Sequence, residues 1–268
     1  MYTILGSTGF VGSNLKDFLV EKGEEVFCPP RNFIPEIGKN YGNVIYCIGL
    51  TSDFREKPSE TIEAHVSLLN KLITNLIFES FIYLSSTRVY QHSNSTKEDD
   101  FIYVNPNIKC DLYNISKLMG ESICLSNDNE NIKVVRLSNV IGNDFNSGNF
   151  FYSILDQAIN DSKIELRQSL ESSKDYIHIS DVLTLMYKIS KNGKERIYNL
   201  ASGYNVANKE LIDLLSRKIK FNLTFRQPIN NLVFNKIETQ KINHEFGFKP
   251  EPIIRTLDKL ITKRLDQK

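Results

Sequence analysis

Short apolar runs alternate with amphipathic segments through the first half of the chain. We expect β-strands at residues 2–5, 25–28, 44–48, 81–84 and 133–137. We expect helices at residues 11–22, 59–75 and 113–125, where apolar side chains recur at helical spacing. In the second of these helices one face would carry Ile62, Val66, Leu69 and Ile73. Near-continuous apolar strands separated by helices are typical of a parallel sheet that is covered on both faces.

A glycine-rich turn, GSTGFVG at residues 6–12, lies between the first predicted strand and the first predicted helix. Glycines at this point let the backbone approach a phosphate, and the helix N-terminus presents free N–H groups and a positive dipole end. Since a second strand follows the helix, the turn stands in a complete βαβ unit, which is the context that dinucleotide binding requires. The sequence therefore predicts an α/β protein with a Rossmann-type, doubly wound parallel sheet that binds a nucleotide.

The second half of the chain has a more mixed pattern. Helical spacing recurs at residues 150–160, 180–191, 208–219 and 253–265, and extended segments at 164–166 and 196–200. We interpret residues 1–145 as the nucleotide-binding domain, completed by elements near 174–200. Residues 146–268 would form mainly a smaller α/β substrate subdomain, interleaved with the sheet. The polar segment 87–112 lacks periodicity and is predicted to be a loop beside the active site.

The composition changes this picture little. The chain has 268 residues and a formal net charge of +1, which gives no reason to expect nucleic acid or a membrane surface as a partner. No apolar run approaches the ~20 residues that cross a bilayer, and a strand that begins at residue 2 leaves no room for a signal peptide. The four cysteines lack metal-ligand spacing. We expect a cytoplasmic protein with reduced thiols and no metal.

Tyr113 and Lys117 stand four residues apart at the start of a predicted helix, so both lie on one face. A lysine ammonium beside a phenol lowers the pKa of the phenol toward neutrality, which suits a general acid or base. Ser86 follows the apolar strand before this helix, on the side of the sheet where ligands of open α/β folds bind. The same spacing recurs at Tyr187 and Lys191 without such a strand, and we interpret that pair as a surface coincidence.

Six segments, in order and spacing, resemble the extended short-chain dehydrogenase/reductase family of nucleotide-sugar epimerases, dehydratases and reductases. They are GSTGFVG at 6–12, FIYLSSTRVY at 81–90, YNISK at 113–117, RLSNVIGN at 136–143, KDYIHISDV at 174–182 and YNLASG at 198–203. The resemblance covers nearly the whole chain. It implies a nicotinamide cofactor, a nucleotide-sugar substrate and a natural setting in polysaccharide biosynthesis.

The resemblance also implies roles for single residues. Tyr113 would be the catalytic acid or base, Lys117 would hold the nicotinamide ribose and tune the phenol, and Ser86 would hydrogen-bond the reacting oxygen. The expected cofactor-binding residues are Gly6, Thr8, Gly9, Phe10, Val11, Gly12, Arg31, Gly49, Leu50, Tyr113 and Lys117. The expected substrate-binding residues are Ser86, Thr87, Asn139 and Arg226, the last of them as a clamp on the diphosphate.

The end of the second predicted strand favours NADP over NAD. NAD-selective relatives carry an acidic residue there for the ribose hydroxyls, whereas this chain has a proline, followed directly by Arg31. Arg31 would pair with a 2′-phosphate through charge-assisted hydrogen bonds. A solvated loop arginine is the alternative interpretation of this residue.

NADPH as cofactor implies net reduction, here of a nucleotide-linked 4-keto-sugar. Related sugar dehydratases carry an acidic pair after the serine, and this chain has Thr87 and Arg88, which disfavours dehydration. The alternatives are a nucleotide-sugar 4-epimerase, a reductase of a small non-nucleotide ketone and, from another class, a non-catalytic NADP-binding sensor. The helices at 59–75 and 113–125 resemble those of the family's four-helix interface, so we expect a homodimer.

Overall fold

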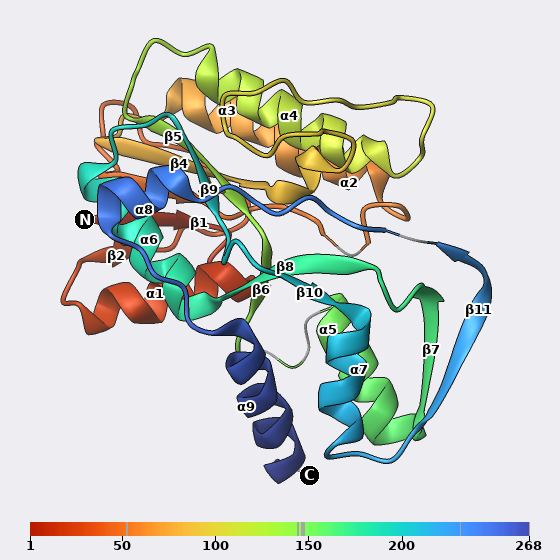
Figure 1. The fold of residues 1–268 in the computed structure, drawn as a ribbon. Helices are drawn as coiled ribbons and strands as arrows, with labels where there is room; N and C mark the ends of the chain where they lie inside the picture. Colours follow the sequence, from red (N-terminus) through yellow and green to blue (C-terminus); the bar gives the residue numbers. More distant parts are fainter. Residues whose placement is uncertain (52, 144, 146–147, 231, 268) are drawn as a thin grey trace.

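A parallel sheet of six strands forms the centre of the described chain, in the order β2-β1-β3-β4-β5-β9 (Figure 1). The strands are β1 (Tyr2–Leu5), β2 (Val26–Phe27), β3 (Asn43–Tyr46), β4 (Ser80–Ser86), β5 (Ile132–Leu137) and β9 (Ile197–Leu200). Every neighbouring pair in this sheet is parallel. The structure is a computed structural model that describes residues 1–51, 53–143, 145, 148–230 and 232–267.

Helices cover both faces of this sheet (Figure 1). One face carries α1 (Phe10–Glu21) and α6 (Ile179–Asn192), and the other carries α2 (Pro58–Ile62), α3 (Leu68–Asn75) and α4 (Asp111–Leu125). A π-helical segment, Glu63–Ser67, joins α2 to α3, and a 3₁₀ turn, Thr87–Tyr90, follows β4. The predicted Rossmann-type, doubly wound sheet is therefore confirmed.

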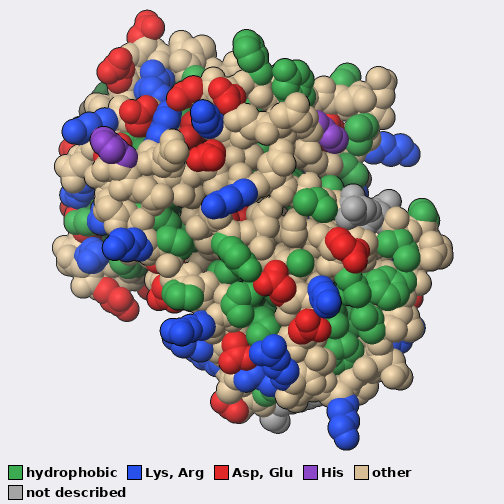
Figure 2. All heavy atoms as spheres, viewed as in Figure 1, with side chains coloured by type: hydrophobic (Ala, Val, Ile, Leu, Met, Phe, Trp, Pro, Cys, Tyr) green, Lys and Arg blue, Asp and Glu red, His purple; other side chains and the backbone are tan. Residues whose placement is uncertain are grey.

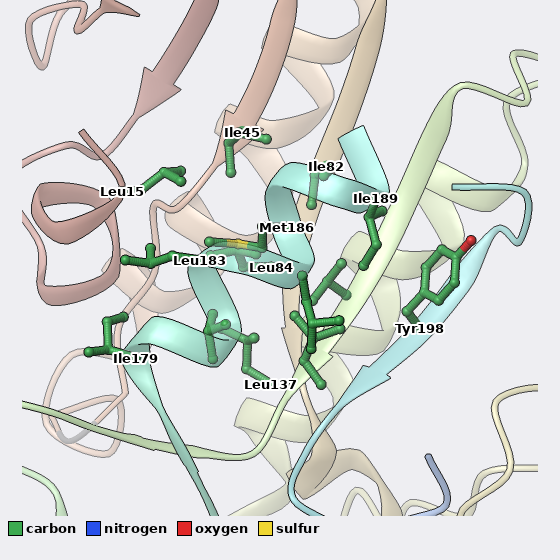
Figure 3. Close-up of a cluster of buried hydrophobic side chains, with 14 of the residues drawn as sticks. Leu15, Ile45, Ile82, Leu84, Leu137, Ile179, Leu183, Met186, Ile189 and Tyr198 are labelled. Atoms are coloured by element: carbon green, nitrogen blue, oxygen red, sulfur yellow. The ribbon is translucent and has the colours of Figure 1, made fainter. Parts of the chain in front are cut away.

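The layer between the sheet and α6 is an apolar core (Figure 3). Leu15 of α1, Met186 of α6 and the strand residues Ile45 and Ile82 are all 0–1% exposed in this cluster. Complete burial of such a side chain stabilises the fold by about 1.5–3 kcal/mol. This layer therefore keeps the strands of the central sheet, and the residues at their carboxyl ends, in fixed positions. A second cluster, which includes Leu69, fills the layer under α3 and α4.

The remaining elements form a second lobe (Figure 1). A three-stranded sheet joins β10 (Asn205–Ala207), β8 (Ser173–His178) and β6 (Asn139–Ile141), and a parallel pair joins β11 (Asn222–Asn230) to β7 (Lys163–Gln168). The lobe also contains α5 (Phe150–Asp156), α7 (Asn208–Ser216) and α9 (Ile253–Asp266). Its own apolar core is a cluster separate from those of the first lobe.

The chain passes repeatedly between the lobes. It leaves the central sheet after β5, returns with α6 and β9, and returns once more with α8 (Gln240–Phe246), which packs on β9 and α6.

The division into domains at residues 145 and 146 stays a prediction, and residue 146 lies outside the described residues. On the face drawn in Figure 2, acidic and basic side chains are interspersed.

Several local predictions need correction. The strand expected at 81–84 continues to Ser86, so this serine is itself the last residue of β4. The expected helical face at 59–75 is wrong at its beginning, because Ile62 is 44% exposed while Ala64 and His65 are buried. The π-helical segment adds one residue to a turn and thereby rotates the buried face. The pattern also did not reveal β6, β8, β10, β11 and α8.

Candidate active site

The strand order reverses between β1 and β3. From β1 the chain first moves outward to β2, and then crosses β1 to add β3, β4 and β5 on the other side. In open α/β sheets, ligands bind in the crevice outside the carboxyl ends of the strands at such a point. Here the GSTGFVG turn follows β1, Gly49 and Leu50 follow β3, and Ser86 ends β4. Candidate residues far apart in the sequence thus meet at one edge.

The three glycines of the first turn have different tasks. Gly6 has a φ of +87°, a left-handed conformation that favours glycine, and a Cβ on Gly12 would lie 2.3 Å from the Gly6 carbonyl oxygen. These two glycines therefore allow the turn and its close packing against α1. A Cβ on Gly9 would meet only that same oxygen, at 3.7 Å, so Gly9 instead leaves the approach to the helix N-terminus open.

This N-terminus fits the phosphates of a dinucleotide. Gly9 is the N-cap of α1, no side chain caps the helix, and the first turn contains no acidic residue that would repel an anion. A cavity of about 410 Å³ adjoins it. The cavity is lined by Thr8, Phe10, Ser13, Asn14 and Asn143. Backbone N–H groups and the helix dipole would together hold a pyrophosphate here.

Tyr113 lies in the first turn of α4 and is only 5% exposed. Burial raises the pKa of Tyr113, whereas a hydrogen bond with the Ser86 side chain and the positive charge of Arg88 lower it. The net shift is upward, which is opposite to the predicted direction. The prediction named Lys117 as the tuning charge, but the groups that lower the pKa of Tyr113 in this structure are Ser86 and Arg88.

Lys117 is buried one turn further along α4. Its Nζ donates a hydrogen bond to the Leu84 carbonyl oxygen at 2.8 Å and lies 5.1 Å from the centre of the Tyr83 ring. A Cβ on Gly49 would lie 3.4 Å from the same Nζ, so Lys117 reaches the loop after β3. Burial lowers the pKa of Lys117 to about 7. An amine that is half-protonated near neutrality and lies beside the loop after β3 suits a role in proton exchange.

A glutamate continues the inward-facing stripe of α4. Glu121 follows Lys117 by one turn and accepts hydrogen bonds from Ser85 and Arg136, with Arg136 Nη2 at 2.6 Å from Glu121 Oε2. Arg136 Nη1 also donates to the Tyr90 hydroxyl. This buried network ties α4 to the last residues of β4 and β5, and thereby fixes the distance between Tyr113 and the strand end that carries its hydroxyl partner.

His65 is a site residue that the sequence did not reveal. It is fully buried in the π-helical segment, and its ring centre lies 5.5 Å from that of Tyr113. The Leu50 N–H donates to His65 Nε2 at 3.3 Å, so the proton of the neutral ring is on Nδ1, which bonds Ser116 Oγ at 2.9 Å. Burial lowers the pKa of His65 to about 2, so the ring stays neutral. The only sequence signal was a histidine within an amphipathic helix, which periodicity cannot distinguish from a surface residue.

The other predicted residues are more widely spread. Thr87 is buried in the turn after β4, and Asn139 Nδ2 donates to the Asp175 carbonyl oxygen at 2.8 Å. Arg31 is exposed in the turn region after β2, and Arg226 is exposed on β11 in the second lobe. The structure therefore brings together the first glycine turn, the loop after β3, Ser86, Tyr113 and Lys117, and leaves the two arginines at the surface.

The described part of the chain contains neither a cluster suited to a metal ion nor a helix suited to a bilayer. No group of three or more His, Cys, Asp or Glu side chains there could hold a metal ion. None of the helices in that part of the chain is sufficiently long and apolar to span a bilayer.

A doubly wound sheet with a glycine turn at its switch point, and a strand-end serine beside a buried tyrosine and lysine, defines an NAD(P)-dependent enzyme of the short-chain dehydrogenase/reductase type. The sequence model of the NAD dependent epimerase/dehydratase family matches residues 2–201, and the chain belongs to this family. The family predicted from the six segments is thereby confirmed.

Individual relatives are more distant. The chain is 29% identical over 216 residues to dTDP-4-dehydro-6-deoxyglucose reductase of Escherichia coli, a match that covers 75% of this chain and 66% of that enzyme. Among solved structures it is similar to MoeE5 in complex with UDP-glucose and NAD, with a TM-score of 0.81, 17% identity and coverage of 100% and 99%. It is also similar to RMD from Pseudomonas aeruginosa complexed with NADPH, with a TM-score of 0.77, 22% identity and 97% coverage of both chains. Both NAD and NADPH thus occur among proteins of this fold.

Proposed function

We propose that this protein reduces a nucleotide-linked 4-keto-sugar with NADPH. The observation that carries the proposal is the position of Ser86 at the carboxyl end of β4 next to the buried Tyr113, which lies one helical turn from the buried Lys117. A carbonyl oxygen bound between these two hydroxyl groups would accept a hydrogen bond from each. The resemblance to a nucleotide-sugar reductase supports the choice of substrate class.

Each side chain has a definite part in this reaction. When bound, the reduced nicotinamide supplies a hydride to the carbonyl carbon. Ser86 and Tyr113 donate hydrogen bonds to the carbonyl oxygen, and Tyr113 gives up its proton as that oxygen becomes an alkoxide. The raised pKa of Tyr113 keeps the phenol protonated near neutral pH, which suits an acid. Lys117 Nζ, which reaches the loop after β3, would bind the nicotinamide ribose and return the proton.

The preference for NADP rests on Arg31. Its side chain is exposed after β2, in a segment, residues 26–32, that contains no carboxylate for ribose hydroxyls. We expect Arg31→Ala to weaken binding of NADPH by about 10-fold, the value of one charge-assisted contact, and to leave NADH binding unchanged. Equal effects on both cofactors would contradict the NADP assignment.

The second lobe is the proposed substrate subdomain. Its sheet strand β6 carries Asn139, and its outer strand β11 carries the exposed Arg226. We propose that Asn139 contacts the sugar and that Arg226 pairs with the diphosphate. Arg226→Ala should then raise KM for the nucleotide sugar and leave kcat nearly unchanged, whereas Arg217→Ala, a change of an exposed arginine after α7, serves as the matched control.

The decisive experiment is an assay of NADPH oxidation with a panel of nucleotide-linked 4-keto-sugars, dTDP-4-keto-6-deoxyglucose first. The proposal expects turnover that Tyr113→Phe abolishes while NADPH binding persists. Interconversion of two nucleotide sugars without net NADPH loss would identify a 4-epimerase instead. A Tyr113→Phe variant that retains the biological function together with cofactor binding would identify a sensor.

We further propose a cytoplasmic homodimer. The four cysteines are free, in keeping with a reducing compartment. Ile62 on α2 and Met119 on α4 are 44% and 52% exposed on the helices that resemble the family's dimer interface. Met119→Glu should therefore shift the protein toward monomer in analytical ultracentrifugation, and an unchanged mass would contradict this interface.

A further inference from the structure

Another cavity lies at the end of the central sheet opposite the proposed active site. Its volume is about 290 Å³, and it is formed where β3, β4 and β5 begin and α6 ends. None of the described residues that line it belongs to the proposed catalytic or cofactor-binding set. Ligand sites usually have volumes above ~300 Å³, so this cavity suits a compact molecule rather than a nucleotide sugar.

A row of buried polar side chains lines this cavity. Asn43 and Ser80, the first residues of β3 and β4, are partners in the strand register, and the Ser80 hydroxyl donates to Asn43 Oδ1 at 2.7 Å. Lys133 of β5 is the register partner of Ile82, two residues beyond Ser80. Because side chains alternate between the faces of a sheet, Asn43, Ser80 and Lys133 all lie on the face that α6 covers.

The Lys133 side chain is only 6% exposed, yet its ammonium has no partner. Among the described residues it forms neither an ion pair nor a side-chain hydrogen bond. Burial, together with the charge of Arg196, lowers the pKa of Lys133. A buried cation without a counter-charge is unfavourable, and a ligand that supplied the missing negative charge would remove that cost.

The other charges at the cavity leave Lys133 uncompensated. Lys191 also lines the cavity, but its Nζ is paired with the Glu24 carboxylate at 3.2 Å. Glu79 is an exposed lining residue, and no ion pair joins it to either lysine. The end of α6 presents carbonyl groups that carry only a partial negative charge. The buried ammonium of Lys133 therefore determines which charge the cavity can hold.

We propose that this cavity binds a compact oxyanion, a phosphate or a carboxylate, through Lys133 and Asn43. An ammonium offers three hydrogen-bond donors and suits either group. Asn43 Nδ2 has one long contact, 3.5 Å to the Met1 carbonyl oxygen, so it remains able to donate to a ligand. The site is independent of the proposed reaction, because it lies at the opposite ends of the strands.

The test is isothermal titration calorimetry of the NADP-loaded protein at constant ionic strength, with inorganic phosphate and acetate as probes. NADP occupies the glycine turn, which would otherwise attract phosphate. We expect wild-type protein to bind at least one probe, and Lys133→Met to weaken this binding about 10-fold or more. Lys133→Arg, which keeps a cation, should lose less. The control Lys163→Met changes an exposed lysine of β7 and should bind like the wild type.

The two probes distinguish the sources of the oxyanion. Lys133-dependent binding of phosphate alone assigns a phosphate-bearing ligand, of acetate alone a carboxylate, and of both a site for either. Wild-type affinity in Lys133→Met overturns the inference, as does the absence of binding to the wild type at millimolar concentration. Since no turnover is measured, either failure leaves the proposed reaction unaffected.

Urea unfolding without a probe checks the variant itself. Methionine removes an unpaired buried charge, so Lys133→Met should be at least as stable as the wild type. A less stable variant would mean that the ammonium already has a structural partner, which would also contradict the inference.

Discussion

Two helices of this protein carry the same tyrosine–lysine spacing, and their surroundings differ completely. On α4, Tyr113 and Lys117 are 5% exposed, and Lys117 Nζ bonds a backbone carbonyl. On α6, the Tyr187 hydroxyl and Lys191 Nζ both contact the Glu24 carboxylate, at 2.8 and 3.2 Å, and Lys191 is 39% exposed at its side chain.

The difference shows that burial, rather than the tyrosine–lysine spacing, gives a lysine the ability to exchange a proton near neutral pH. The pKa of Lys191 is raised by its hydrogen bond to Glu24, whereas burial lowers that of Lys117 to about 7. The α6 lysine, paired with the Glu24 carboxylate, therefore stays a cation near neutral pH. The buried α4 lysine can change its charge near neutral pH, and only that pair lies at the carboxyl ends of the strands.

The largest expected effect comes from removing the phenolic oxygen of Tyr113, and the same change at Tyr187 serves as its comparison. Tyr113→Phe should lower kcat for NADPH oxidation about 10²–10⁴-fold, because the acid is lost, whereas Tyr187→Phe should change it less than about twofold. Steady-state kinetics of both variants checks this. Equal losses would remove the functional distinction between α4 and α6.

The next largest expected effect is on the way the free energy of unfolding changes with pH. Lys117 has a lower pKa folded than unfolded, so above about pH 7 the unfolded state binds more protons and stability rises with pH. The rise should be at most about 1.4 kcal/mol per pH unit between about pH 7 and 9, and Lys117→Met should remove it. Urea titrations across this range test the slope, with Lys191→Met as the control that retains it.

Replacing His65 should have a smaller effect, which combines a loss of stability with a loss of activity. His65→Leu removes the acceptor of the Leu50 N–H and the partner of Ser116, which should cost about 1–3 kcal/mol of stability and reduce kcat about 10-fold. The pH–rate profile should keep its shape, because the imidazole is neutral throughout the working range. His65→Asn, which retains a donor and an acceptor, should recover part of the loss. A profile that shifts in His65→Leu would instead indicate a titrating histidine.

The smallest effect is expected for the surface carboxylate. Glu24→Gln removes the ion pair with Lys191 and should destabilise the protein by less than about 1 kcal/mol, with no change in kcat. Thermal unfolding and the NADPH assay measure both. A drop in activity would mean that the α6 pair takes part in function after all.

Much of the fold was predictable because its signals are local. The strand–glycine turn–helix succession and the apolar runs required only neighbouring residues to be recognised, and the expected positions of Tyr113, Lys117 and Ser86 follow from them. Strands such as β8 were not predicted, because KDYIH mixes charged and apolar residues and pairs with segments thirty or more positions away in sequence. The π-helical segment was not predicted, because a single extra residue in one turn does not change the amino-acid composition of the helix.

The amino-acid order by itself determined the family, the nucleotide-binding turn and the pair of residues that carries the proposed chemistry, since these depend on spacing along one element. Only the tertiary structure decided the electrostatics. Burial, which sets whether Lys117 or Lys191 can lose its proton, depends on which distant segments cover a side chain. The same holds for the contact between the His65 and Tyr113 rings, because residues of separate elements meet only after the chain has folded.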